Sequence, residues 1–185
     1  GGKNWPPTTY SPATNRYYIP TIDGCNKAFT EVTEPGQLKG RMLFLGGAPF
    51  STFEDPECGR IWGSITAIDV GTGKVVKKHT TKHPQLGGLM STAGGLVFAG
   101  YAEGQVVALD AETLEELWKF ETGSAINAPP MSFMSDGKQY IAIQVGTGAV
   151  PPAPGAPAPP ANPNAPPAVK PRLLVYTLDG TAKLP

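Results

Sequence analysis

Short apolar runs rich in β-branched or aromatic residues recur along the chain, each bounded by Gly, Asp, Asn or Pro. Such runs are typical of β-strands, which need only about four to eight residues between turns. Asp136-Gly137, Glu103-Gly104 and Asp179-Gly180 are turn signals that predict hairpins. The one helix-compatible run, Ala111–Phe120, is short and has strand-like flanks. The pattern therefore predicts an all-β chain, with strands at Arg16–Pro20, Met42–Gly46, Ser64–Asp69, Leu96–Ala99, Val106–Asp110, Tyr140–Val145 and Leu173–Leu178.

An internal repeat organises these strands. Residues 67–77 align with residues 108–118, and the shared Ala, Asp and Thr stand in register at a spacing of 41 residues. In each copy a strand, an Asp-x-x-Thr turn and a second strand follow one another, and in the turn the Asp side chain can accept backbone N–H groups. A period of about 40 residues with four short strands is typical of β-propeller blades. The chain is long enough for about three such blades, and three blades cannot close a ring.

Composition excludes some classes of partner. The 15 basic and 15 acidic residues cancel, so nothing favours nucleic acid or an acidic membrane surface. No stretch approaches the roughly 18 consecutive apolar residues of a transmembrane helix. The first residues carry neither Met nor a signal-peptide pattern, and we expect the chain to begin within a longer propeller.

Residues 150–171 consist almost entirely of Pro, Ala and Asn. Such a tract cannot join a sheet and favours a polyproline-like or disordered surface loop between two strands; recruitment of an aromatic groove is the alternative. The predicted organisation is propeller blades over 1–149, a Pro/Ala-rich loop over 150–171, and the closing strand of the last blade with a tail over 172–185.

Three segments, taken together and in order, resemble the pyrroloquinoline-quinone (PQQ) dependent alcohol dehydrogenases. They are Gly1-Gly2-Lys3-Asn4-Trp5-Pro6-Pro7 with Tyr17-Tyr18-Ile19-Pro20, then Thr92-Ala93-Gly94-Gly95-Leu96-Val97-Phe98-Ala99-Gly100, then Gly123-Ser124-Ala125-Ile126-Asn127-Ala128-Pro129-Pro130 with Asp136-Gly137-Lys138-Gln139-Tyr140. The resemblance covers nearly all of the chain outside the Pro-rich tract. It implies the C-terminal blades of an eight-bladed β-propeller.

The same resemblance implies a function and a set of partners. The whole enzyme would be periplasmic or secreted, would bind PQQ and calcium, and would oxidise alcohols to aldehydes or ketones. Its catalytic base and calcium ligands would lie on an N-terminal portion of the propeller, supplied as a second chain, so this chain would hold no catalytic or metal-ligating residue and would be inactive alone. A separate electron acceptor, such as a cytochrome c, would take the electrons.

Two other functions stay open. A non-enzymatic scaffold propeller of the outer-membrane assembly type shares the Ala-x-Asp-x-x-Thr repeat, but lacks the Gly-Gly-Lys-Asn-Trp segment. A sugar-oxidising quinoprotein of a more distant propeller type is not expected to carry the same ordered segments.

The resemblance also implies cofactor contacts. Asn4 and Trp5 correspond to an Asn-Trp pair that faces the quinone, where an amide or an indole N–H can donate to its oxygens. The alternative is that Asn4 caps a turn and Trp5 packs in the core. Gly148, Ala149 and Val150 fall on a Gly-rich loop beside the cofactor, although here the loop runs directly into the Pro-rich tract.

Leu86 stands where the family often carries a Trp near the substrate pocket. The smaller side chain implies a roomier pocket and an alcohol bulkier than methanol.

Cys25 and Cys58 are the only cysteines. They are compatible with one disulfide in an oxidising compartment, which we expect; two free thiols, or a bridge from Cys25 to another part of the enzyme, are the alternatives. His79 and His83 are four residues apart, but they stand in a Thr- and Lys-rich segment that we expect to be a loop, which argues against a metal site.

Overall fold

The structure is a computed structural model that describes residues 2–24, 61–146 and 170–184. These residues form β-strands and loops and contain no helix, which confirms the all-β prediction. The strands are β1 Thr9–Ser11, β2 Arg16–Asp23, β3 Trp62–Asp69, β4 Val75–Thr81, β5 Leu89–Ser91, β6 Leu96–Gly100, β7 Gln105–Asp110, β8 Glu116–Glu121, β9 Met131–Ser135, β10 Lys138–Val145 and β11 Arg172–Thr177.

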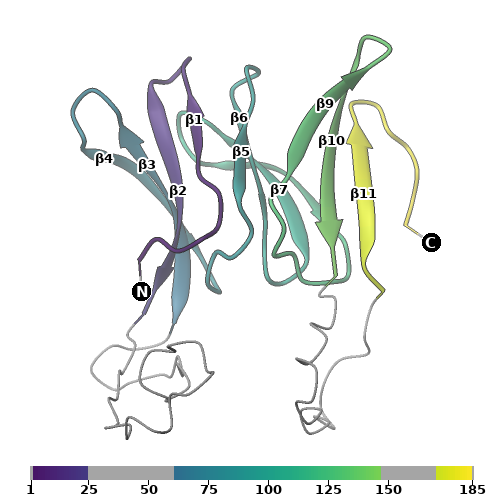
Figure 1. Cartoon of the computed structure of the whole chain (residues 1–185), viewed down its shortest axis with the longest axis horizontal. Coiled ribbons are helices and arrows are strands. Elements are labelled where there is room, and N and C mark those ends of the chain that lie inside the picture. Colours follow the sequence, from purple (N-terminus) through teal and green to yellow (C-terminus); the bar gives the residue numbers. More distant parts are fainter. Residues whose placement is uncertain (1, 25–60, 147–169, 185) are drawn as a thin grey trace, which may run out of the picture.

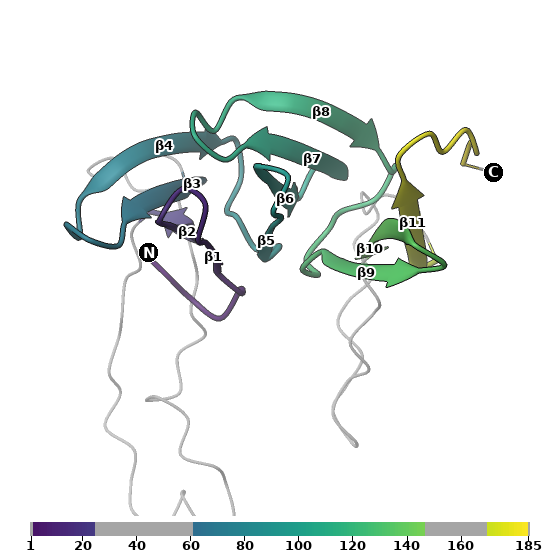
Figure 2. The same cartoon turned by 90° about the horizontal axis from the view of Figure 1, so that it is seen from above.

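The strands make three antiparallel sheets that stand side by side (Figure 1). The first sheet has the order β1-β2-β3-β4, the second β5-β6-β7-β8 and the third β9-β10-β11. Seen from above, the sheets follow an arc, with β4 and β8 on its outer side and β1, β5 and β9 toward its inner side (Figure 2). Each sheet meanders from the inner side of the arc outward, as propeller blades do.

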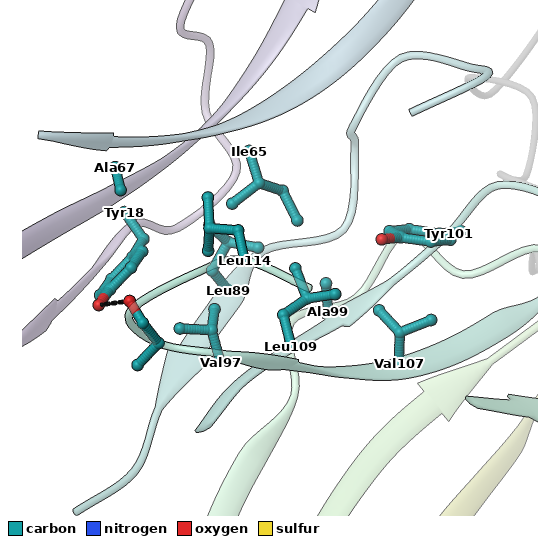
Figure 3. Packing of buried hydrophobic residues seen from close by; sticks show 11 residues of the cluster. Tyr18, Ile65, Ala67, Leu89, Val97, Ala99, Tyr101, Val107, Leu109 and Leu114 are labelled. Carbon is teal, nitrogen blue, oxygen red and sulfur yellow. Dashed lines mark hydrogen bonds between the residues drawn. The ribbon is translucent and has the colours of Figure 1, made fainter. Parts of the chain in front are cut away.

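The second sheet is buried on both faces because it lies between the other two. Val107 and Leu109 of β7 pack toward the first sheet, in a cluster with Tyr18 and Ile65 (Figure 3). Val106, the alternate residue of the same strand, packs toward the third sheet. Successive side chains of a strand point to opposite faces, so β7 reads as a continuous apolar run.

The repeated turns have the predicted geometry. The carboxylate of Asp69 accepts hydrogen bonds from the backbone N–H and the hydroxyl of Thr72, both at 2.7 Å. Asp110 accepts the same two bonds from Thr113, at 2.8 and 3.2 Å. These bonds lower the pKa of both carboxyl groups from the ordinary value.

The helix-compatible run Ala111–Phe120 forms no helix, as its strand-like flanks indicated: it forms a turn, in which Leu114 has φ 59°, followed by β8. Two other parts of the sequence interpretation differ from the structure. His79 lies in β4, where we expected a loop. β11 matches the predicted strand, yet among the described residues it is the edge of a three-stranded sheet, with no fourth strand beyond it.

Candidate functional site

Three inner loops lead into the innermost strands β1, β5 and β9; they comprise residues 2–8, 82–88 and 123–130. The loops meet at one seam, where the N–H of Leu89 donates to the carbonyl oxygen of Pro7 at 3.0 Å. A Cβ atom on Gly88 would lie 2.7 Å from both Pro7 Cδ and Pro129 Cβ. Only glycine fits between the two prolines, so the three loops are in close contact there.

The inner loops lie at the end of the sheets where β2, β6 and β10 finish. Gly2 and Ile22 exchange two backbone hydrogen bonds at the end of β2. The side-chain amide of the buried Gln85 donates to the carbonyl oxygen of Gly100 at 2.9 Å, at the end of β6. The N–H of Gly146 donates to the carbonyl oxygen of Ala125 at 3.0 Å, just beyond β10.

Asn4 and Trp5 stand on the first inner loop with their side chains open to solvent. The backbone N–H of Trp5 donates to Oδ1 of Asn4 at 2.9 Å. This bond uses the oxygen of the amide, and among the described residues its two N–H donors have no hydrogen-bond partner. Trp5 is 63% exposed, so within this chain its indole is not a core residue.

Lys3 is a residue of this loop that the sequence interpretation did not single out. Its ammonium donates to the carbonyl oxygens of Asn4 and Pro6, the latter at 2.7 Å. It braces the loop and places a positive charge beside Asn4 and Trp5. The sequence signal that could have identified Lys3 is its place in the Gly-Gly-Lys-Asn-Trp segment, directly before Asn4 and Trp5.

Leu86 is half-buried on the second inner loop, between the buried Gln85 and Gly87. Strand pairing places it at the position that Trp5 occupies on the first loop, because β1 and β5 pair with β2 and β6 in matching registers. The repeat of 41 residues places Asn127 at the same position on the third loop. Asn127 is exposed, and it lies in the segment Gly123–Pro130 that resembles the family.

The other predicted site residues lie outside the described residues: Gly148, Ala149, Val150, Cys25 and Cys58. Their roles stay predictions.

The comparisons with known proteins agree with this arrangement of sheets. The family model described as "Glucose/ethanol/alcohol dehydrogenase, beta-propeller domain", abbreviated PQQ, matches residues 47–141. The chain belongs to this family. The prediction that the chain consists of β-propeller blades of the PQQ family is thereby confirmed.

Relatives of similar sequence are named as quinoprotein and quinohemoprotein alcohol dehydrogenases. The chain is 41% identical to the quinoprotein ethanol dehydrogenase of Pseudomonas putida over 153 residues, which are 82% of this chain and 23% of that protein. It is 35% identical to the quinohemoprotein alcohol dehydrogenase ADH IIB of Pseudomonas putida, over 100% of this chain and 26% of that protein. The chain thus spans about a quarter of the length of these relatives.

Solved structures show the same fold. The quinohemoprotein alcohol dehydrogenase ADHIIG from Pseudomonas putida HK5 superposes with a TM-score of 0.66 at 30% identity, covering 80% of this chain and 22% of that one. A europium-containing methanol dehydrogenase gives a TM-score of 0.61 at 30% identity, covering 79% and 25%.

The described ranges hold no cluster of three or more His, Cys, Asp and Glu side chains that could bind a metal ion. His79 Nε2 lies 3.0 Å from the hydroxyl of Tyr101, and His83 Nε2 lies 3.7 Å from a carboxylate oxygen of Glu103. None of these ranges forms a helix able to span a bilayer.

Proposed function

We propose that the chain supplies about three blades of a PQQ- and calcium-dependent alcohol dehydrogenase that oxidises alcohols to aldehydes or ketones. The observation that carries this proposal is the first inner loop. It presents an exposed indole, a free amide donor and an ammonium group at the seam of three blades.

These groups suit the cofactor. PQQ is a planar tricarboxylate bearing an ortho-quinone, and when bound it supplies the two-electron oxidation by accepting a hydride from the alcohol. Trp5 offers a flat apolar surface to such a ring. The N–H donors of Asn4 suit its carboxylate or quinone oxygens, and the charge of Lys3 favours an anion nearby. The catalytic base and the calcium ligands would be held by other blades of the ring.

Leu86 is proposed to line the substrate pocket. It takes the position of Trp5 on the adjacent loop and has a smaller side chain, so the space left above it suits an alcohol bulkier than methanol. Gly148, Ala149 and Val150 are proposed to follow the cofactor from Gly146, which has φ 96° and allows a sharp change of chain direction.

The remaining blades are proposed to form the N-terminal portion of the ring, carried by a second chain. The outward face of the third sheet supports this, because large apolar side chains lie open on it. They are Met131, Phe133, Leu173 and Val175. The opposite face of the same sheet carries Ile143 and Tyr176 and is covered by the second sheet. A further blade would cover the open face in the same way.

A periplasmic or secreted location with a Cys25–Cys58 bridge is also proposed. Asp23 and Trp62 are partners in the β2–β3 pair. Cys25 follows Asp23 by two residues and Cys58 precedes Trp62 by four, and this short separation along the sequence from one strand pair favours a bridge between them. The electrons would leave to a separate acceptor such as a cytochrome c.

The test is alcohol oxidation by the assembled protein. The apo form, supplied with PQQ and calcium, should reduce an artificial electron acceptor when ethanol or a longer alcohol is added, and should stay inactive when either PQQ or alcohol is omitted. A protein that binds no PQQ under these conditions would instead favour the non-enzymatic scaffold.

A further inference from the structure

We propose that Asn127 is a further cofactor-binding residue, whose side-chain amide donates a hydrogen bond to an oxygen of the bound quinone. This inference rests on the proposed function. Asn127 would give the third blade a cofactor contact at the position that Trp5 occupies on the first blade.

The position of Asn127 follows from the repeat. In each sheet the innermost strand pairs with its neighbour in a corresponding register, with Tyr10 opposite Tyr17, Ser91 opposite Val97 and Ser132 opposite Ile141. The residues standing five places before these inner-strand positions are therefore equivalent. They are Trp5, Leu86 and Asn127. The three residues thus occupy the same position on the three inner loops.

The backbone on both sides of Asn127 is fixed. Ile126 is fully buried, its N–H donates to the carbonyl oxygen of Tyr101 at 3.2 Å, and its side chain fills the space over Gly100. On the other side Pro129 rests against Gly88 at the seam. A rigid loop thus presents an exposed polar side chain that the core does not require, which is the arrangement expected of a preorganised ligand contact.

The surroundings of Asn127 favour the cofactor over bulk solvent. The N–H of Gly146 donates to the carbonyl oxygen of Ala125 at 3.0 Å, so the residue just beyond β10 contacts this inner loop two residues before Asn127. The first inner loop, with Trp5, meets the third through Pro7, Gly88 and Pro129. Asn127 therefore lies on a loop joined, through Gly88, to the loop that carries Trp5. An amide donor there matches an anion that carries three carboxylates.

The test is PQQ binding by the assembled apo protein with calcium present, measured by titration alongside a thermal melt of the apo form. Asn127→Ala should weaken PQQ binding by about ten- to a hundredfold, as expected for one hydrogen bond to a charged group, and leave the apo melting temperature unchanged. Asn127→Asp, which keeps the shape but adds a negative charge, should weaken binding further. Gln139→Ala is the control, because Gln139 is an exposed amide of the same sheet near the far end of β10 and bonds to Ser132.

The outcomes separate the two proposals. Wild-type protein that binds PQQ while both Asn127 variants bind it equally well would overturn the assignment of Asn127 and leave the proposed function standing. Wild-type protein that binds no PQQ would overturn the proposed function itself. A variant with a lower apo melting temperature and unchanged affinity would show that Asn127 only stabilises its loop, and would also overturn the assignment.

Discussion

The hydroxyl of Tyr18 donates a hydrogen bond to the carbonyl oxygen of Ala111 at 2.7 Å, across the interface between the first and second sheets (Figure 3). Ala111 belongs to the Asp-x-x-Thr turn of the second sheet. Arg16 holds the same turn from the first sheet, through an ion pair with Glu112 at 2.6 Å. The repeated turn is therefore both a local structure and the point at which one blade anchors the next.

Replacing Tyr18 with Phe should destabilise the protein by about 0.5–1.5 kcal/mol, because the buried carbonyl oxygen loses one neutral donor while the ring keeps its packing. The measurement is urea unfolding of the assembled protein. Tyr17→Phe is the matched control, since the hydroxyl of Tyr17 bonds Thr8 at the exposed surface. Equal effects of the two variants would contradict a special role for the Tyr18 bond.

The fold could be predicted from the sequence where its signals are local. The Asp69 and Asp110 turns follow from side-chain chemistry and a fixed period, and the apolar run of β7 predicts a strand buried on both faces. β8 follows only from the repeat, which places a second strand after the Asp-x-x-Thr turn; its exposed and charged residues carry no strand pattern of their own, and it forms by pairing with β7. Leu117 and Trp118 are exposed there, so burial does not mark it either.

Only the part of the candidate site that has a local sequence signal could be predicted. Asn4 and Trp5 sit in a distinctive segment, whereas Asn127 becomes visible only when strand registers align the three inner loops. The seam of Pro7, Gly88 and Pro129 joins residues far apart in the sequence, which no local pattern predicts.

The Asp110 turn should make stability depend on pH. Hydrogen bonds from the backbone N–H of Thr113 and Glu112 lower the pKa of Asp110 from its ordinary value of 3.8. A carboxyl group with a lowered pKa in the folded state stabilises the protein above the unfolded pKa, and this stabilisation is lost as the pH falls through the folded pKa. Acid should therefore destabilise the turn from about pH 4 downward.

The Asp110→Asn side chain keeps an oxygen acceptor but cannot titrate. The stability of this variant should therefore depend less on pH than that of the wild type below about pH 4. The measurement is the melting temperature between pH 6 and pH 3. Glu115→Gln, which removes a charge from the same exposed turn, is the control. An identical flattening in both variants would argue against the Asp110 hydrogen bonds as the cause.

The two cysteines should be joined. Peptide mapping without reductant, on protein isolated from the periplasm, is expected to recover Cys25 linked to Cys58. Such a bridge closes a loop of about 34 residues, which the chain-entropy model values at about 3–4 kcal/mol, so Cys58→Ser should lower stability measurably. Free thiols at both positions, or Cys25 linked to another chain, would refute the pairing.

The exposed apolar face of the third sheet predicts that the chain binds further propeller blades. Leu173 is 65% exposed and Met131 56%, on a face whose opposite side is packed. The chain should therefore copurify with a larger chain that supplies the remaining blades, and light scattering should report the mass of the complex. A folded, monodisperse monomer of 19.4 kDa would contradict this expectation.

The most direct test of the proposed PQQ site is the contribution of Asn4 to cofactor affinity. Titration of the assembled apo protein with PQQ, with calcium present, should show about ten- to a hundredfold weaker binding for Asn4→Ala than for the wild type, together with an unchanged apo melting temperature. Trp5→Ala should weaken binding as well, because it removes the exposed indole. Unchanged affinity in Asn4→Ala, with a lower apo melting temperature, would show that Asn4 is a turn residue and would contradict the site.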